Sequence, residues 1–209
     1  MLNFFFIILS LLFYGKEEGN PDTIRLVNPS FEGKPQDATV PIGWIPCGEN
    51  STPDILPGIW GVYNEPSDGN SYLGLIARED GTWEKIAQAL RRPFKADVCY
   101  EFSVDLSRAS SYDGYNIPVK LQIWASGKPC GREQLLAETS VIRHNNWKTY
   151  HFEFTPRKDF KYILIEARFA NGIYFAYKGN LLIDNCSPFR PCQRAFIDNI
   201  DVETHLLDL

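Results

Sequence analysis

The feature of this sequence that most constrains its fold is a period-two alternation of apolar and polar residues, which recurs in short runs along most of the chain. Successive side chains of a strand point to opposite faces of a sheet, so each run predicts a strand with one buried face. Gly, Pro, Asn and Asp separate the runs and are typical of turns. The predicted strands are residues 23–31, 71–78, 82–90, 99–107, 117–125, 147–154, 161–169, 179–185 and 195–203. Because no long helical stretch alternates with them, we predict an all-β fold, an antiparallel β-sandwich.

One segment, residues 83–92, also has helical propensity. Few of its residues are strongly apolar, Pro93 closes it, and its alternation fits a strand, which is our prediction. The longest irregular stretch, residues 33–59, contains five prolines and is typical of a functional or packed loop.

The composition limits the class of protein. A length of 209 residues with 44% hydrophobic residues describes one globular domain. The formal net charge of −5 argues against a nucleic-acid-binding protein, because such proteins normally carry a basic stripe.

The N-terminal residues 1–15 are almost wholly apolar and are followed at once by Lys16, Glu17 and Glu18. The apolar stretch has about a dozen residues, fewer than the ~20 that a membrane-spanning helix needs. It therefore predicts a signal peptide over residues 1–15, although no Lys or Arg precedes it and no clean cleavage site follows. The alternative is a buried N-terminal strand. With a signal peptide, residues 22–209 form a single domain with a C-terminal extension from about residue 188. The mature protein is then expected to be secreted, periplasmic or on the outer-membrane surface, and not to span a membrane.

Five cysteines, Cys47, Cys99, Cys130, Cys186 and Cys192, show neither a C-x-x-C pair nor a His at zinc spacing, which argues against a metal-thiolate site. In an exported protein they predict one or two disulfides and a leftover thiol. Cys186 with Cys192 and Cys99 with Cys130 are the candidate pairs, because each is separated by a short loop or a possible hairpin. Mostly free buried thiols are the alternative.

Aromatic residues make up 14% of the chain, and strand alternation assigns most of them to the core. Trp44 and Trp147 also fit packing positions. Trp124 is the exception, because it shares its predicted strand face with Lys120 and Gln122.

A sugar ring presents a weakly apolar face of C–H groups and a rim of hydroxyls. Proteins bind it by stacking an aromatic ring on that face and placing polar side chains around it. Trp124 with Gln122, Lys120, Asp105 and Ser103 is the candidate surface, provided that their two strands are neighbours. The alternative is a Trp124 covered by a loop or by another protein. Four further aromatic residues in loops are candidates to line the same groove: Trp60, Tyr63, Tyr112 and Tyr115.

Several motifs, in their order along residues 24–187, resemble the galactose-binding-like jelly rolls, and within these the carbohydrate-binding modules of families 4 and 9. The first is Asn28-Pro29-Ser30-Phe31-Glu32, followed by Gly43-Trp44. The later motifs are Asp68-Gly69-Asn70-Ser71-Tyr72-Leu73, Gln88 with Leu90 and Pro93-Phe94, Cys99-Tyr100-Glu101-Phe102-Ser103, Trp147 with Tyr150, Phe152 and Phe154, and Leu182-Ile183-Asp184-Asn185. Thr52-Pro53-Asp54 is similar to a segment of exported Bacteroidetes envelope proteins that carry this domain.

The resemblance implies a structural calcium ion. Ca²⁺ takes six to eight oxygen ligands. Carried over to this sequence, Glu32 and the carbonyl of Ser30 are ligands, and Asn70 or Ser71 offers a carbonyl. Asp184 is the preferred ligand from the last strand, and Asp198 replaces it if residues 195–203 form the closing strand.

The sequence gives little support for catalysis. His144, His151 and His205 show no paired spacing, and no nucleophile elbow, P-loop or dinucleotide-binding motif occurs. We therefore expect an exported, non-catalytic module that binds carbohydrate and holds a structural calcium ion. The alternative is a cell-surface or outer-membrane subunit of a secretion or gliding complex that uses the same fold to bind a protein partner.

Overall fold

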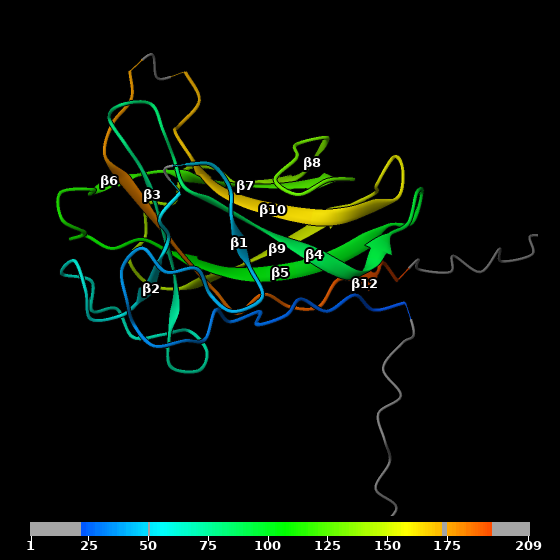
Figure 1. Cartoon of the computed structure of the whole chain (residues 1–209), viewed down its shortest axis with the longest axis horizontal. Coiled ribbons are helices and arrows are strands. Elements are labelled where there is room, and N and C mark those ends of the chain that lie inside the picture. The colour runs from blue at the N-terminus through cyan, green and yellow to red at the C-terminus, as the bar shows by residue number, and fades with distance from the viewer. Residues whose placement is uncertain (1–21, 50, 173–174, 194–209) are drawn as a thin grey trace, which may run out of the picture.

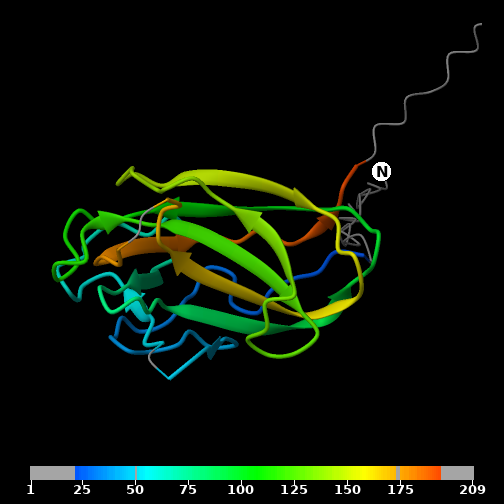
Figure 2. The same cartoon turned by 90° about the horizontal axis from the view of Figure 1, so that it is seen from above.

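A computed structural model describes residues 22–49, 51–172 and 175–193 as a sandwich of two β-sheets stacked in layers (Figures 1 and 2). Residues 1–21 and 194–209 lie outside the described residues, so neither the predicted signal peptide nor the predicted strand 195–203 is tested. No helix among the described residues is long and apolar enough to cross a membrane.

The first sheet has five strands in the described part of the chain. Their order across the sheet is β1 (Ile45–Pro46), β4 (Lys85–Phe94), β10 (Phe160–Arg168), β7 (Lys120–Ser126) and β8 (Gln134–Glu138). All neighbouring pairs are antiparallel. β4 confirms that residues 83–92 contain a strand and not a helix.

The second sheet has seven strands in the described residues. Its main order is β12 (Arg190–Pro191), β5 (Tyr100–Ser107), β11 (Gly179–Asp184), β3 (Tyr72–Ala77) and β2 (Asp54–Leu56). In addition, β9 (Lys148–Phe154) pairs with β5, and the short β6 (Ile117–Pro118) pairs in parallel with β11. Apart from that short pair the sheet is antiparallel, so the predicted antiparallel sandwich is confirmed.

The core lies between the sheets and follows the alternation of the sequence. In β5, Tyr100, Phe102, Val104 and Leu106 are all buried. Phe94 of β4 packs against Tyr100 with the ring centroids 5.3 Å apart. Trp44 is also buried, with its ring 5.3 Å from that of Phe31, which confirms its packing role.

The first predicted strand, residues 23–31, is wrong. Only Ile24 forms a bridge, to Phe189. Asn28 and Phe31 both have φ of +52°, a left-handed conformation that breaks an extended strand. The alternation in this segment comes from side chains that alternate between core and solvent without sheet pairing. The short strands β1, β2, β8 and β12 were missed, because they are two to five residues long and lie in loop-like sequence.

Two disulfides join segments that are far apart in the sequence. They link Cys47 to Cys130 and Cys99 to Cys192, and Cys186 is free and buried. Both predicted pairings are therefore wrong, while the prediction of one or two disulfides and a leftover thiol is confirmed, with two disulfides formed.

The Cys47–Cys130 disulfide crosses one face of the five-stranded sheet. Cys47 follows β1 and Cys130 lies between β7 and β8, and β4 and β10 separate β1 from β7. Three strand spacings amount to about 14 Å, yet the two Cα atoms are 5.5 Å apart. The connection must therefore pass over β4 and β10, and Cys47 packs against Ala87 and Leu164 on their outer face. We call this connection the disulfide strap.

Candidate functional site

The structure separates the residues of the predicted sugar-binding face. Trp124, Gln122 and Lys120 lie on β7, whereas Ser103 and Asp105 lie on β5 in the other sheet. The two strands are not neighbours, so the composite surface that the sequence predicted does not form.

Asp105 has a structural role instead. Its buried carboxylate accepts hydrogen bonds from the hydroxyls of Ser67 and Thr149, both at 2.6 Å, and from the side-chain amide of Asn185 at 3.0 Å. Burial by itself raises the pKa of this carboxyl, but the three hydrogen bonds together hold it below its usual value. The group therefore ties a loop and two strands together.

Trp124 lies next to the disulfide strap and is half-buried. Its ring packs against the cluster of Cys47, Ala87 and Leu164. Its indole Nε1 donates a hydrogen bond to Glu166 Oε1 at 2.9 Å. The loop that carries Cys47 therefore covers part of the Trp124 ring, as in the alternative considered for this residue.

The two polar neighbours of Trp124 on β7 are bonded within the protein. Lys120 is buried and forms an ion pair with Glu138 at 2.9 Å. The side-chain amide of Gln122 donates to the same carboxylate. Their polar groups bind one another, which leaves little hydrogen-bonding capacity around Trp124.

A different set of predicted residues does converge. A pocket of about 250 Å³, which we call the Trp60 pocket, is formed by loops that flank β2 and follow β5. Its lining residues are Asp37, Ala38, Thr52, Asp54, Trp60, Ile76, Arg78, Tyr112, Asp113 and Tyr115. The structure thus brings together Trp60, Tyr112 and Tyr115. Tyr63 is 73% exposed but does not line the pocket.

Trp60 is held in an unusual backbone conformation. Its φ is +53°, and the glycines on either side, Gly58 and Gly61, also have positive φ. For a bulky residue this conformation costs about 1–3 kcal/mol and persists only where the surroundings fix it. Here the amide of Asp113 donates to the carbonyl of Trp60 at 3.1 Å. The result is an indole that remains 45% exposed at the pocket.

Asp54 forms part of the pocket's interior. Its Oδ2 accepts a 2.5 Å hydrogen bond from the buried hydroxyl of Tyr112, and its Oδ1 accepts one from the amide of Ala38 at 2.8 Å. Burial raises the pKa of this carboxyl, and the hydrogen bonds, including one from the side chain of Trp60, offset that rise only in part. The carboxylate of Asp54 therefore connects Trp60 and Tyr112 by hydrogen bonds.

Arg78 and Glu84 form an ion pair beneath the pocket. Arg78 Nη2 lies 2.5 Å from Glu84 Oε1 and 3.0 Å from the hydroxyl of Thr52. Burial raises the pKa of Glu84 to about 7 in spite of Arg78. Among the described residues the buried Nη1 of Arg78 has no hydrogen-bond partner. A buried donor without a partner costs about 1–3 kcal/mol, so a ligand hydroxyl that accepts from it would be favoured.

Sequence reasoning missed the polar half of this pocket: Asp37, Asp54, Arg78 and Asp113. These residues lie on four separate segments, and only the fold brings them together. The signal that was available is Trp60 itself, because a Trp within Gly58-Ile59-Trp60-Gly61 predicts a ring held out on a turn.

The residues of the predicted calcium site surround the loop of residues 67–71. Glu32 Oε1 accepts hydrogen bonds from the amides of Asn70 at 2.9 Å and Ser71 at 3.2 Å. Asp184, which is fully buried, accepts from the amides of Ser67 at 2.8 Å and Asp68 at 2.9 Å.

Two further oxygen atoms that could ligate a metal ion lie at the same loop, on Ser30 and Asp68. The hydroxyl of Ser30 donates to Asp68 Oδ2 at 2.7 Å. Burial raises the pKa of Asp184 to about 7 in spite of the hydrogen bonds from three backbone amides, and the charge of Asp68 adds to the rise. The oxygens of this donor set are of the hard kind that calcium prefers, and a cation would offset the burial of Asp184. Asp198 lies outside the described residues.

Another possible metal group is excluded by its chemistry. Cys99, Glu153 and Cys192 are the only Cys, His or carboxylate trio in the described ranges whose ligand atoms lie within 4.8 Å of one another. Cys99 and Cys192 form a disulfide, so they offer no thiolate to a metal ion.

Comparison with known proteins gives a consistent picture of the fold. The sequence profile of one family, described as a carbohydrate binding domain, matches residues 25–168. No curated protein matches the sequence.

Two solved structures illustrate the range of proteins that share this architecture. One is the CBM22-1 xylan-binding domain of Xyn10C from Paenibacillus barcinonensis, with 16% identity, a TM-score of 0.51, and coverage of 82% of this chain and 96% of that chain. The other is the Stig cyclase Fisc from Fischerella sp. TAU in complex with an indole compound, with 16% identity, a TM-score of 0.55, and coverage of 82% and 98%. At such identities the likeness concerns the fold alone.

Proposed function

Because this chain belongs to the carbohydrate binding domain family, we propose that it is an exported, non-catalytic module that binds a sugar unit in the Trp60 pocket. The observation that carries this proposal is the 45% exposed indole of Trp60 beside a pocket of about 250 Å³ with polar walls. The ring offers a stacking surface for the C–H face of a sugar.

The polar groups of the pocket suit the hydroxyl rim of the same sugar. Asp37 and Asp113 are exposed carboxylates that accept hydrogen bonds from vicinal hydroxyls. Arg78 Nη1 is a donor without a partner among the described residues. Donors and acceptors therefore lie next to one aromatic platform, which is the combination that a neutral sugar requires.

The proposal is tested by affinity electrophoresis and calorimetry against a panel of neutral polysaccharides. Trp60→Ala should abolish binding to the polysaccharide that the parent protein retains. Tyr63→Ala is the matched control, because Tyr63 is an exposed aromatic residue close by that does not line the pocket. Equal binding by the parent protein and Trp60→Ala would refute the pocket. If no glycan binds and the native protein co-purifies with a cell-surface protein complex, the alternative of a protein-binding subunit replaces the proposal.

Two parts of the proposal have their own tests. A non-catalytic module should leave the reducing ends of the bound polysaccharide unchanged in number after long incubation. Export predicts that the protein purified from its host begins beyond residue 15. Two disulfides, with sequence separations of 83 and 93 residues, support an oxidising compartment.

We also propose a calcium ion at the loop of residues 67–71, with carboxylate ligands from Glu32 and Asp184 and further oxygens from Ser30 and Asn70. When bound, the ion would supply a positive charge that balances the buried carboxylate of Asp184. Addition of EDTA should lower the melting temperature of the parent protein, and calcium should restore it. Asp184→Asn should remove the response to both. An unchanged melting temperature on addition of EDTA would refute the site.

A further inference from the structure

Three cationic side chains surround one indole ring on the outer face of the five-stranded sheet. The guanidinium carbon of Arg168 lies 3.6 Å from the ring centroid of Trp83, that of Arg132 lies 5.3 Å away, and Lys85 Nζ lies 5.4 Å away. They come from β10, the β7–β8 turn and β4, so the fold assembles them from three segments. We call this group the Trp83 cluster.

One carboxylate, that of Glu166, lies among these cations. Its oxygens are already bonded to side chains of the protein. Its side chain is 1% exposed. It accepts hydrogen bonds from Trp83 Nε1 at 2.8 Å and Trp124 Nε1 at 2.9 Å, and it forms an ion pair with Arg132. Among the described residues, neither Lys85 nor Arg168 forms an ion pair. The cluster therefore has three positive charges against one negative charge.

The electrostatic cost of this arrangement is visible in the cations. Burial lowers the pKa of Lys85, and the neighbouring Arg132 and Arg168 lower it further, while Glu166 acts in the opposite direction. Burial likewise lowers the pKa of Arg168; Glu166 and Glu138 oppose this lowering, and Arg132 adds to it. Like charges held this close repel one another, so an added anion would be attracted to the cluster.

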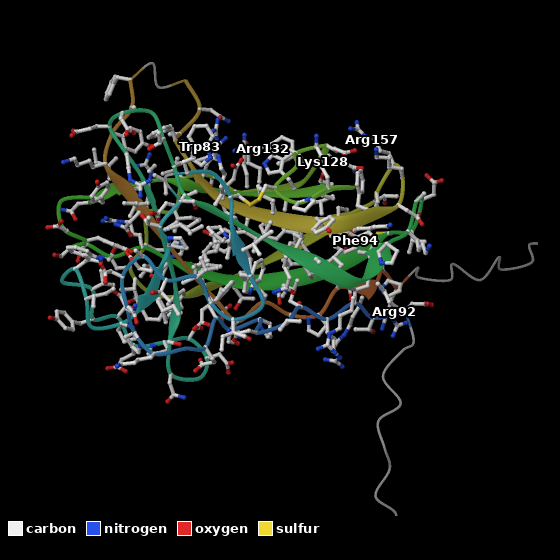
Figure 3. All side chains as sticks on the ribbon, viewed as in Figure 1. Trp83, Arg92, Phe94, Lys128, Arg132 and Arg157 are labelled. Atoms are coloured by element: carbon white, nitrogen blue, oxygen red, sulfur yellow. A yellow bond between two sulfur atoms is a disulfide. The ribbon has the colours of Figure 1, made fainter. Side chains whose placement is uncertain are left out.

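The surroundings extend the positive charge along the same side of the molecule. Figure 3 shows Trp83, Arg132, Lys128 and Arg157 following one another along the upper side of the view. Glu133 and Glu138, the carboxylates of the adjoining turn and strand, are paired with Lys158 and Lys120. This side is cationic although the whole chain has a net charge of −5.

An open cleft gives a ligand access to Trp83 and Lys85 of the cluster. It has a volume of about 380 Å³ and is lined by Trp83 and Lys85 together with Cys47, Gly48, Glu49, Ser51, Gly81 and Thr82. Glu49 is the acidic residue of this lining, and Ser51 and Thr82 are its hydroxyl-bearing residues. The disulfide strap borders the cleft through Cys47. The cleft is therefore large enough for one sugar unit, with Lys85 as the cation of its lining.

We propose that the Trp83 cluster binds the anionic group of an acidic polysaccharide, a carboxylate or a sulfate carried on a sugar unit. The cations supply the charge-assisted hydrogen bonds that either group accepts, and the row toward Arg157 suits a repeating anion along one chain. That the anion is carried on a glycan rests on the proposed carbohydrate-binding function. The site itself is separate from the Trp60 pocket and can be tested separately.

The test compares polyanions with neutral chains of the same backbone. Polygalacturonate and dextran sulfate are the carboxylated and sulfated probes, and highly methyl-esterified pectin and dextran are their neutral counterparts. The parent protein should bind at least one charged probe more tightly than its neutral counterpart, and the affinity should fall as NaCl is raised. Whichever charged probe is preferred identifies the anionic group.

Variants then locate the binding site. The double variant Lys85→Gln/Arg168→Gln should bind the preferred probe about tenfold or more weakly, which corresponds to roughly 1.4 kcal/mol. Arg143→Gln/Lys148→Gln removes one Arg and one Lys from exposed positions elsewhere and should change the affinity less than about twofold. Arg168→Lys keeps the charge but loses the guanidinium plane that lies on Trp83, so its affinity should fall between those of the parent protein and the double variant. Unchanged melting temperatures establish that each variant is folded.

Three results would overturn the inference: no preference for the charged probes, an equal loss of affinity in both double variants, or equally tight binding of a single-stranded oligonucleotide. The inference and the proposed function fail independently. Loss of neutral-glycan binding in Trp60→Ala concerns only the Trp60 pocket, and loss of polyanion binding in Lys85→Gln/Arg168→Gln concerns only the Trp83 cluster.

Discussion

The disulfide between Cys47 and Cys130 divides the outer face of the five-stranded sheet. Cys47 lies against Ala87 and Leu164, with the ring of Trp124 packed beside them. Trp83 lies two residues before Lys85, whose carbonyl accepts a hydrogen bond from the amide of Cys47 at 3.0 Å. The strap therefore covers the apolar middle of the face and leaves the Trp83 cluster at its border.

Removal of the strap should destabilise the protein. A crosslink between residues 83 positions apart lowers the entropy of the unfolded chain and contributes about 4–5 kcal/mol in the chain-entropy model. We expect Cys47→Ser/Cys130→Ser to lower the free energy of unfolding by an amount of that order, measured by urea denaturation under non-reducing conditions. The same double variant should expose Trp124 to quenching by iodide.

The thiol count checks the connectivity. The unfolded protein should titrate one thiol without reductant and five after reduction, and the native protein should titrate none because Cys186 is buried. Three thiols in the unfolded, unreduced protein would contradict the assignment of two disulfides.

The strands that could be predicted from the sequence are those in which buried and exposed side chains alternate with period two. β5 and β9 show this most clearly, since residues 99–107 and 147–154 were assigned almost to their observed ends. Alternation does not reveal whether a segment finds a pairing partner. Residues 23–31 alternate in the same way but turn through the left-handed conformations of Asn28 and Phe31, so they form no strand.

Candidate site residues were predicted where one residue carries its own signal, and missed where the site depends on pairing between distant segments. Trp60, between glycines, could be identified as a displayed ring. Asp37 and Asp113 are ordinary turn residues in the sequence, and only the fold shows that they line the same pocket as Trp60. Asp105 was predicted to lie beside Trp124 because strand neighbours cannot be read from alternation. The neighbours of β7 are β10 and β8, and β5 lies in the other sheet.

Glu166 should be important for stability because it is the one buried counter-charge of the Trp83 cluster. Glu166→Gln replaces an acceptor oxygen by an amide donor that faces Trp83, Trp124 or Arg132, and it leaves three cations without a counter-charge. We expect a loss of about 2–4 kcal/mol in the free energy of unfolding. Glu79→Gln is the control, because the Glu79–Lys178 pair has side chains that are 69% and 42% exposed and should cost less than about 1 kcal/mol. Equal losses in the two variants, measured by urea denaturation, would contradict this role.

The stability of the protein should decrease as the pH rises through the range in which Glu84 titrates. In the unfolded chain this carboxyl ionises near pH 4.5, and in the folded protein burial raises its pKa to about 7. Between these values the unfolded state binds fewer protons than the folded state, so the free energy of unfolding falls as the pH increases. The contribution is up to about 3 kcal/mol. It is measured by comparing urea denaturation of the parent protein and Glu84→Gln from pH 5 to pH 7.5. The difference between the two profiles should slope downward toward pH 7, and a flat difference would contradict the raised pKa.

Gly74 should be required for both the core and the Trp60 pocket. A Cβ atom at this position would lie 2.5 Å from the hydroxyl of Tyr112 and 2.6 Å from Leu56 Cδ1, and both side chains are buried. Tyr112 is fixed by its hydrogen bond to Asp54, so it cannot move without breaking that bond. Gly74→Ala should therefore lower the free energy of unfolding by about 1–3 kcal/mol and weaken sugar binding, because Tyr112 and Asp54 line the pocket. Gly127→Ala is the matched control, since a Cβ there meets its nearest neighbour at 3.4 Å and leaves the pocket untouched. If Gly74→Ala kept the stability and the glycan affinity of the parent protein, the close packing of β3 against Tyr112 would be contradicted, because that packing leaves no room for a methyl group.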